Sequence, residues 1–429
     1  MRVLLLTLYY PPLNNIASLR LQAFEEFLVK EGIQVDVITR HYNQEQLNNT
    51  SLLIANESAE SFKQSYLKKD NIIYTNFDKV SFPLKISQIL PPFIKGIFNY
   101  LMKDVYHYGW LKYVNEAFEK ELKSNKYDFI IASYGPPISL VAAKKMSEKY
   151  NIPWIADFRD IFIDERDKSY HLFCKKIVQN QLLKNASGFL FSSKGMEDYF
   201  FKHARPPLKE KPFSLVYNGV NSTHVAMIAS KDNAIVKQFQ ALKQSYNKVL
   251  LHTGSLYIGQ DVDFFIKALN KFNEDNKEQI ALVFIGLADK SYVKTHDNEK
   301  IFILDKVQHS TSLYLQKLAD ALVLPVWNGR YTGLSGKTFE YLHSGNTVLC
   351  GPNPQEDLLF FVLQSSNAEV LKDYASFKLA MENLKDQTTI KRVELNILQR
   401  SYWVHKLANF LKELKLKSSD SGREKLKIG

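Results

Sequence analysis

Short apolar runs that alternate with helix-length segments constrain the fold of this chain more than any other feature. Val3 to Thr7 is the first such run, a segment with apolar residues at helical spacing follows it, and a further run starts at Gln34 after Gly32. A run of this length is typical of a strand that is buried on both faces of a sheet. The pattern therefore predicts a βαβ unit and a parallel sheet.

The same alternation continues along the chain and falls into two sets. The predicted strands are Val3 to Thr7, Gln34 to Thr39, Phe129 to Ser133, Trp154 to Asp157 and Gly188 to Ser192 in the first set, and Lys248 to Thr253, Ile280 to Ile285, Ile301 to Leu304, Ala321 to Pro325 and Thr347 to Cys350 in the second. A chain of 429 residues suits two domains of roughly 200 residues each. We expect two Rossmann-like doubly wound parallel-sheet α/β domains, 1–205 and 206–395, then a helix over 396–417 and a mobile basic tail over 418–429.

The composition indicates a globular protein with a preference for anionic partners. Hydrophobic residues make up 45% of the chain, which leaves no room for extended disorder, and the net charge is +11. This charge suits phosphate-rich ligands or the anionic face of a membrane. Basic and acidic residues are interleaved, and no helix-turn-helix, zinc-finger or basic-zipper pattern organises them, so we expect no nucleic-acid partner.

The cysteines and the apolar stretches indicate the compartment. Cys174 and Cys350 are far apart and have no neighbouring Cys or His at metal spacing, so we expect neither a disulfide framework nor a metal site. No cleavage site follows the first apolar run, and no stretch reaches the ~20 apolar residues of a membrane span. We therefore expect a cytoplasmic protein.

The segment Phe82 to Val114 is rich in large apolar residues with interspersed lysines. Such a segment is more often a pair of core helices, and packing is the interpretation we favour. The alternative is peripheral contact with a membrane surface, where the segment would meet a lipid-linked ligand.

Residues that directly follow strands are the candidates for ligand binding, since open α/β sheets bind ligands at the carboxyl ends of their strands. Gly254 and Ser255 follow the first strand of the second set, and a glycine there lets the backbone approach an anion. The alternative is a plain tight turn. His252 is the histidine nearest to this loop.

A second loop, 329–342, follows the Ala321 to Pro325 strand and leads into a helix. Gly333 and Gly336 allow close backbone approach to a phosphate or sugar, and Lys337 can neutralise a diphosphate. Glu340 lies one helical turn further on, where a carboxylate can accept both hydroxyls of a ribose. The alternative is an exposed helix salt bridge between Lys337 and Glu340.

Taken together, several motifs resemble the retaining GT-B glycosyltransferases of family four, in the order in which that family has them. The resemblance extends over nearly the whole chain. The matching segments are Tyr9-Tyr10-Pro11-Pro12, Ser133-Tyr134-Gly135-Pro136-Pro137, Trp154-Ile155-Ala156-Asp157-Phe158-Arg159-Asp160, Tyr217-Asn218-Gly219-Val220, Thr253-Gly254-Ser255-Leu256 and the loop 329–342.

The resemblance implies a donor site in the C-terminal domain and two domains that face each other across a cleft. Glu340 corresponds to the second glutamate of the family's paired-glutamate motif, and Thr332 stands where the first would be. The expected donor-binding residues are Gly254, Ser255, Arg330, Thr332, Gly333, Leu334, Ser335, Lys337 and Glu340. The resemblance also implies that the C-terminal helix returns to the N-terminal domain.

On the acceptor side, Asn14 and Asn15 replace the family's usual glycine pair, and Gly135 and Pro136 precede a helix that begins near Ser139. Asp157, Arg159 and Asp160 are the catalytic candidates, because two carboxylates and a guanidinium follow one strand and can orient an acceptor hydroxyl. A buried structural Asp–Arg pair is the competing account.

The resemblance implies transfer of a hexosyl or N-acetylhexosaminyl group from a UDP or GDP sugar to a hydroxyl of a glycan or lipid-linked acceptor, with retention and without a metal or other cofactor. Synthesis of a bacterial capsule, lipopolysaccharide or other envelope glycan is the expected setting. A nucleotide-sugar epimerase of the same fold is one alternative. A donor-binding subunit without activity is another, since Thr332 replaces a motif glutamate.

Overall fold

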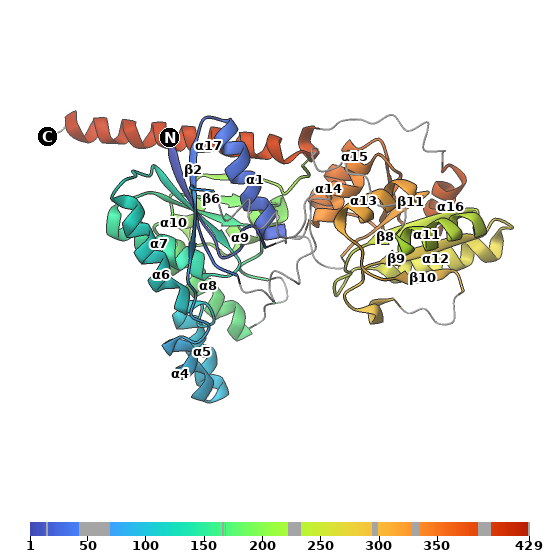
Figure 1. Ribbon diagram of the computed structural model, residues 1–429, viewed down its shortest axis with the longest axis horizontal. Coiled ribbons are helices and arrows are strands. Elements are labelled where there is room, and N and C mark those ends of the chain that lie inside the picture. Colours follow the sequence, from blue (N-terminus) through green and yellow to red (C-terminus); the bar gives the residue numbers. More distant parts are fainter. Residues whose placement is uncertain are drawn as a thin grey trace. The chain divides into compact units, whose positions relative to one another are not determined.

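The computed structural model describes residues 1–13, 16–42, 69–164, 167, 169–221, 233–293, 299–327, 334–384 and 396–427. Contacts between residues divide the chain into two compact units (Figure 1). The described residues up to Asn218, together with those from Arg400 onward, form the first unit, and Gly219–Gln399 contains the second.

The first unit is built on a sheet whose strands are all parallel, in the order β3-β2-β1-β4-β5-β6-β7. The strands are β1 (Arg2–Leu6), β2 (Gln34–Arg40), β3 (Ile72–Thr75), β4 (Phe129–Tyr134), β5 (Trp154–Phe158), β6 (Gly188–Phe191) and β7 (Phe213–Leu215). The helices are α1 (Ile16–Lys30), α4 (Phe82–Ile89), α5 (Pro92–Met102), α6 (Leu111–Leu122), α7 (Ile138–Tyr150), α8 (Ser169–Leu183), α9 (Lys194–His203), α10 (Pro206–Lys209) and α17 (Arg400–Lys427), with a 3₁₀ turn η1 at Tyr108–Trp110.

The second unit has the same design, with parallel strands in the order β10-β9-β8-β11-β12-β13. The strands are β8 (Lys248–Thr253), β9 (Ile280–Ile285), β10 (Ile301–Leu304), β11 (Ala321–Pro325), β12 (Val348–Gly351) and β13 (Ala368–Val370). The helices are α11 (Ala234–Ser245), α12 (Val262–Asp275), α13 (His309–Leu318), α14 (Gly336–Ser344), α15 (Glu356–Gln364) and α16 (Tyr374–Glu382), with 3₁₀ turns η3 (Lys290–Tyr292) and η5 (Asn396–Leu398).

The central strands of both sheets are buried on both faces, as the uninterrupted apolar runs predict. Every residue of β9 is buried, and so are Val3 to Leu6 of β1, although successive side chains of a strand point to opposite faces. The two parallel-sheet α/β units confirm the predicted Rossmann-like fold class.

The division between the two units lies later than predicted. We expected it at 205/206, but β7 pairs with β6 and so belongs to the first sheet, and the division follows Asn218. Only three residues make up β7, which follows the Arg205-Pro206-Pro207 segment at the predicted boundary. A strand this short carries too little apolar pattern to be seen in the sequence.

The C-terminal helix is longer than predicted. α17 contacts α1 and β7 of the first unit and runs on to Lys427, whereas the sequence predicted a helix over 396–417 and a mobile tail from 418. The residues after 417 have no apolar period, but they extend a helix that is already nucleated, which costs less than starting a new one.

The interpretation of Phe82 to Val114 as a pair of core helices is wrong for its first part. η1 and α6 are packed into the core, with Trp110 and Val114 fully buried. In contrast, α5 has no buried residue, and α4 buries only Pro83 and Ser87. Among the helices of the described residues, none is long and apolar enough to cross a membrane.

Candidate functional site

A pocket opens at the carboxyl end of the second sheet, where the strand order reverses between β8 and β11. Ligands of open α/β sheets bind at such a switch point. The space inside the pocket is about 620 Å³ when the solvent-filled space at its mouth is included. Its walls come from the ends of β8, β9 and β10 and from the first turns of α13 and α14. The lining residues are Thr253, Gly254, Ser255, Ile285, Gly286, Lys306, Val307, His309, Ser312, Lys337 and Glu340.

The turn after β8 and the first turn of α14 fit together because residue 254 is a glycine. Gly254 has a φ of +80°, in the left-handed region that favours glycine. A Cβ at this position would lie 2.9 Å from Cε of Lys337. The Lys337 side chain therefore lies against the turn, and Nζ donates a hydrogen bond to the carbonyl oxygen of Ser255 at 2.6 Å.

Lys337 is a charged group in a partly dehydrated position. Burial lowers the pKa of Lys337 to about 8, and the nearby Glu340 carboxylate opposes this shift. The ammonium also lies 5.6 Å from the ring centre of Tyr257, which stacks on Trp327. At neutral pH the protonated ammonium has lost hydration without gaining a full counter-charge. Such a group is well placed to bind an anion.

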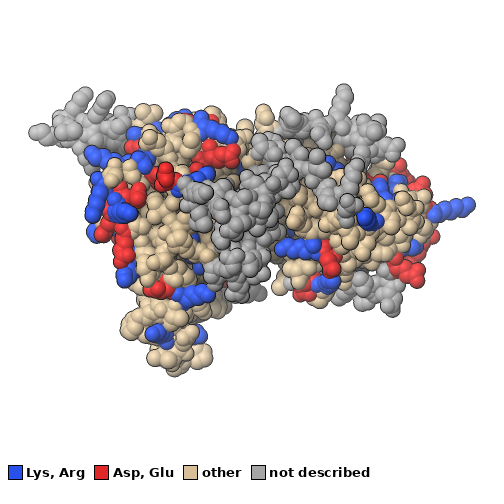
Figure 2. Space-filling model, in the orientation of Figure 1, with Lys and Arg blue, Asp and Glu red and all other residues tan. Residues whose placement is uncertain are grey.

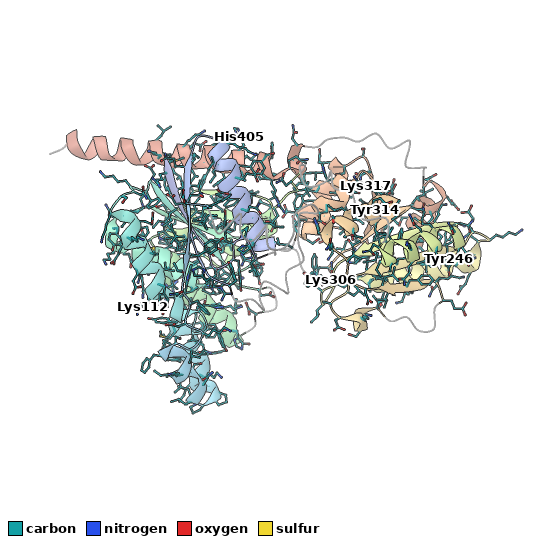
Figure 3. All side chains as sticks on the ribbon, in the orientation of Figure 1. Lys112, Tyr246, Lys306, Tyr314, Lys317 and His405 are labelled. Atoms are coloured by element: carbon teal, nitrogen blue, oxygen red, sulfur yellow. The ribbon has the colours of Figure 1, made fainter. Side chains whose placement is uncertain are left out.

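Glu340 pairs with a histidine that sequence reasoning passed over. Oε1 of Glu340 lies 2.9 Å from Nε2 of His309, and both side chains line the pocket. His309 begins α13 on the segment that follows β10. Its position after a predicted strand was a signal that could have identified it as a ligand-binding candidate. The same signal applies to Lys306, which Figure 3 labels on the second unit.

A buried hydrogen-bond network supports the turn from below. The hydroxyl of Tyr341, the residue after Glu340, accepts from the backbone N–H of Thr253 at 2.8 Å. Nε2 of Gln316 donates to Oγ1 of Thr253 at 3.2 Å. Tyr341 and Gln316 are fully buried, and burial raises the pKa of Tyr341. The network joins α13 and α14 to the end of β8 and holds the pocket wall in place.

His252 is a packing residue at neutral pH. Its imidazole is fully buried, and Nδ1 donates to the carbonyl oxygen of Val323 at 2.9 Å. Burial, followed by the positive charge of Lys337, lowers the pKa of His252 to about 3. A neutral imidazole next to Lys337 adds no second positive charge to the pocket.

The helix α14 presents its N-terminus beside Lys337. Ser335 is the N-cap residue, directly after Leu334, and its hydroxyl lies 3.3 Å from that of Thr338, while no described side chain caps the helix. The N–H groups of a first turn favour anions. The other predicted residues of this loop, Arg330, Thr332 and Gly333, and the acceptor-side residues Asn14 and Asn15, lie outside the described residues.

In the first unit, the predicted residues after β4 and β5 do come together. Arg159 donates from Nε to the carbonyl oxygen of Tyr134 at 2.9 Å and from an Nη atom to the carbonyl oxygen of Gly135, which precedes Pro136. Gly135 has a φ of +101°, and a Cβ there would lie 2.9 Å from Arg159 and from Asp160. Burial lowers the pKa of Arg159, and the side chain of Asp160 is 65% exposed.

Asp157 lies apart from this group, in a buried ion pair with a residue that the sequence did not single out. Its carboxylate is 0% exposed and accepts from Nη2 of Arg20 at 2.7 Å and from Oγ of Ser133 at 2.8 Å. Arg20 is 2% exposed and also donates to the carbonyl oxygen of Val216 at 2.6 Å. This arrangement favours the structural account of Asp157, with Arg20 rather than Arg159 as the partner.

Searches with the sequence found no matching family model and no matching curated protein. The fold matches many solved structures. The chain aligns with HepE of Anabaena, solved in complex with UDP-glucose, at 13% identity over 99% of this chain and 100% of that one (TM-score 0.54).

It also aligns with α,α-trehalose 6-phosphate synthase of Burkholderia multivorans at 9% identity over 97% and 99% of the two chains (TM-score 0.60). A third match is UDP-GlcNAc 2-epimerase of Methanocaldococcus jannaschii, at 12% identity over 96% of this chain and 100% of that one (TM-score 0.51). At these identities the likeness establishes the two-domain Rossmann-like fold of the GT-B type.

Proposed function

We propose that this chain is a glycosyltransferase whose second unit binds a nucleotide-diphosphate sugar in the pocket at the end of β8. The buried Lys337 beside the Gly254 turn carries the proposal. Its ammonium and the N-terminus of α14 suit a diphosphate, and Glu340, one turn along the helix, suits the ribose hydroxyls. Thr332, Gly333 and Arg330 belong to the same loop and are proposed to contact the donor sugar and phosphates.

A UDP sugar is the proposed donor. HepE, which shares the fold, was solved with UDP-glucose. Lys337 would stabilise the negative charge that develops on the departing UDP when the bond from the anomeric carbon to the diphosphate oxygen breaks. We propose retention at that carbon and no metal, as in the family that the motifs resemble.

The acceptor is proposed to be a hydroxyl of a glycan or lipid-linked glycan in envelope polysaccharide synthesis at the cytoplasmic face of the membrane. In the first unit, the exposed carboxylate of Asp160 and the Gly135-Pro136 turn are the groups proposed to meet it, with Arg159 holding both in place. Asn14 and Asn15 are proposed for the same side.

An epimerase that acts on a nucleotide sugar is the second candidate, because UDP-GlcNAc 2-epimerase of M. jannaschii shares the fold. An epimerase converts the sugar without an acceptor. Incubation of the protein with UDP-GlcNAc alone, followed by analysis of the sugar, separates the two activities. Conversion without an acceptor would replace the transferase proposal.

We predict that UDP and UDP-sugars raise the melting temperature selectively. A ligand at about 100 times its Kd adds about 2.7 kcal/mol to the stability of the folded state. The measurement is a thermal-shift panel of UDP, GDP, ADP, UDP-glucose and UDP-GlcNAc. Stabilisation by GDP alone would change the donor base, and the absence of any shift would reject the nucleotide site.

The affinity for UDP-glucose is predicted to fall as the pH rises above about 8. The diphosphate binds protonated Lys337, whose pKa is about 8 in the free protein, so above that pH each binding event must take up a proton. The Kd should be constant near pH 7 and rise by up to about tenfold per pH unit above 8. Calorimetric titration from about pH 7 to about pH 9 measures it, and a flat profile would contradict the assigned role of Lys337.

A further inference from the structure

The helices α4 and α5 form a structurally defined hairpin that stands out from the first unit (Figure 1). Ser81 caps α4, accepting from the N–H of Leu84, and Oγ of Ser87 on α4 donates to Oδ1 of Asn99 on α5 at 2.6 Å. The hydroxyl of Tyr100 on α5 lies 2.6 Å from Nδ1 of His171 on α8. Ring contacts of Phe93 and Tyr100 with Tyr170 of α8, both with centres 6.1 Å apart, add to these polar contacts and hold the hairpin against the first unit.

Several large apolar side chains of this hairpin are exposed to solvent. α5 has no buried residue, and its exposed apolar side chains at positions 93, 97 and 101 recur every fourth residue, on one face of the helix. Phe82 and Ile89 lie two turns apart on α4, at 76% and 82% exposure. We call these side chains the hairpin patch: Phe82, Ile89, Phe93, Ile94, Ile97 and Leu101. Large apolar side chains exposed together on one helical hairpin mark an interaction site.

The charge around the hairpin patch is positive. No Asp or Glu occurs between Val80 and Lys103, whereas Lys85, Lys95 and Lys103 do. At the base of the hairpin, burial and the positive charges of Lys144 and Lys145 lower the pKa of Lys103. The face of the hairpin that Figure 2 shows is tan with scattered blue. An anionic partner would relieve this repulsion among the lysines.

We propose that the α4–α5 hairpin docks this protein onto the surface of a bilayer that contains anionic lipids. The hairpin patch would enter the boundary between headgroups and acyl chains, and the lysines would contact the phosphates. At 8 and 11 residues, the two helices suit a position in the interface. The lysines favour a bilayer over a protein partner, because lysine is depleted in protein–protein interfaces.

Vesicle co-sedimentation of the full chain tests this proposal. We expect binding to vesicles of phosphatidylglycerol and phosphatidylcholine, weaker binding to phosphatidylcholine alone, and loss of binding on the order of 100-fold in the double variant Phe93→Glu/Leu101→Glu. The matched control is Leu363→Glu/Leu379→Glu, which charges two exposed leucines of α15 and α16 in the second unit and should bind as the wild type does.

The proposal would be overturned if the wild type bound no vesicle, or if the control variant lost binding equally. It would also be overturned if the wild type were an oligomer in sedimentation and the hairpin variant a monomer, because the hairpin patch would then be a protein interface. The melting temperature of each variant shows that it is folded. The docking proposal does not depend on the proposed function. Vesicle binding without a UDP-induced thermal shift would leave it standing while rejecting the nucleotide site.

Discussion

Replacing Lys337 with methionine is expected to weaken binding of UDP and UDP-glucose by about 100-fold and to stabilise the ligand-free protein. Loss of one partner from a dehydrated charge pair costs about 3 kcal/mol of binding free energy, which is about 100-fold in Kd. Methionine keeps most of the length of the side chain beside Gly254 and removes only the ammonium.

The gain in stability follows from the lowered pKa of Lys337. The folded protein holds this proton with a pKa of about 8, against 10.5 for an ordinary lysine, so below pH 8 the folded state bears the cost of a dehydrated charge. After allowance for solvent screening and for the lost hydrogen bond to Ser255, we expect a gain of about 1 kcal/mol at pH 7. The wild type becomes more stable as the pH rises from 8 to 10.5, so the advantage of the variant should disappear over that range.

Isothermal titration and urea unfolding at two pH values measure both effects. The matched control is Lys267→Met, which removes an exposed lysine from α12 of the same unit and should change neither quantity. If the variant binds UDP as tightly as the wild type does, Lys337 does not contact the diphosphate. Weaker binding together with lower stability would assign Lys337 a structural role.

The fold was predictable because its parallel strands are buried on both faces. Such strands appear in the sequence as uninterrupted apolar runs, and β9 matches its predicted bounds of Ile280 to Ile285. The proximity of Gly254 and Lys337 follows from the same logic. The two residues follow β8 and β11, which are neighbours in the sheet. Lys337 and Ser255, which are 82 positions apart in the sequence, therefore meet at the carboxyl end of the sheet.

Side-chain contacts between distant elements could not be predicted from the sequence. Arg20 lies in the first half of α1 and fits the polar face of an amphipathic helix, yet it is buried against Asp157, 137 positions away. No periodicity distinguishes an arginine that faces solvent from one that faces a buried carboxylate. The exposure of the hairpin patch was equally hidden, since an apolar helix has the same sequence pattern whether or not another element covers it.

Asp157→Asn is expected to destabilise the first unit by about 3–5 kcal/mol. The substitution leaves the guanidinium of Arg20, which is 2% exposed, without its counter-charge in the interior. Trp110 and Trp154 are buried in the core of this unit, so tryptophan fluorescence during urea unfolding reports on it. Asp160→Asn is the matched control, because its side chain is 65% exposed and its replacement should change the free energy of unfolding by at most about 0.5 kcal/mol.

A double-mutant cycle distinguishes a structural Asp157 from a catalytic one. If the ion pair is structural, Arg20→Met combined with Asp157→Asn should cost less than the sum of the two single changes, with a coupling energy of about 1–3 kcal/mol, because no unpaired charge remains in the core. A catalytic Asp157 predicts a different result: the single variant would keep its stability and its affinity for UDP and lose only turnover with an acceptor. That result would make Asp157 a catalytic residue. Additive costs in the cycle would mean that Arg20 and Asp157 stabilise the unit independently.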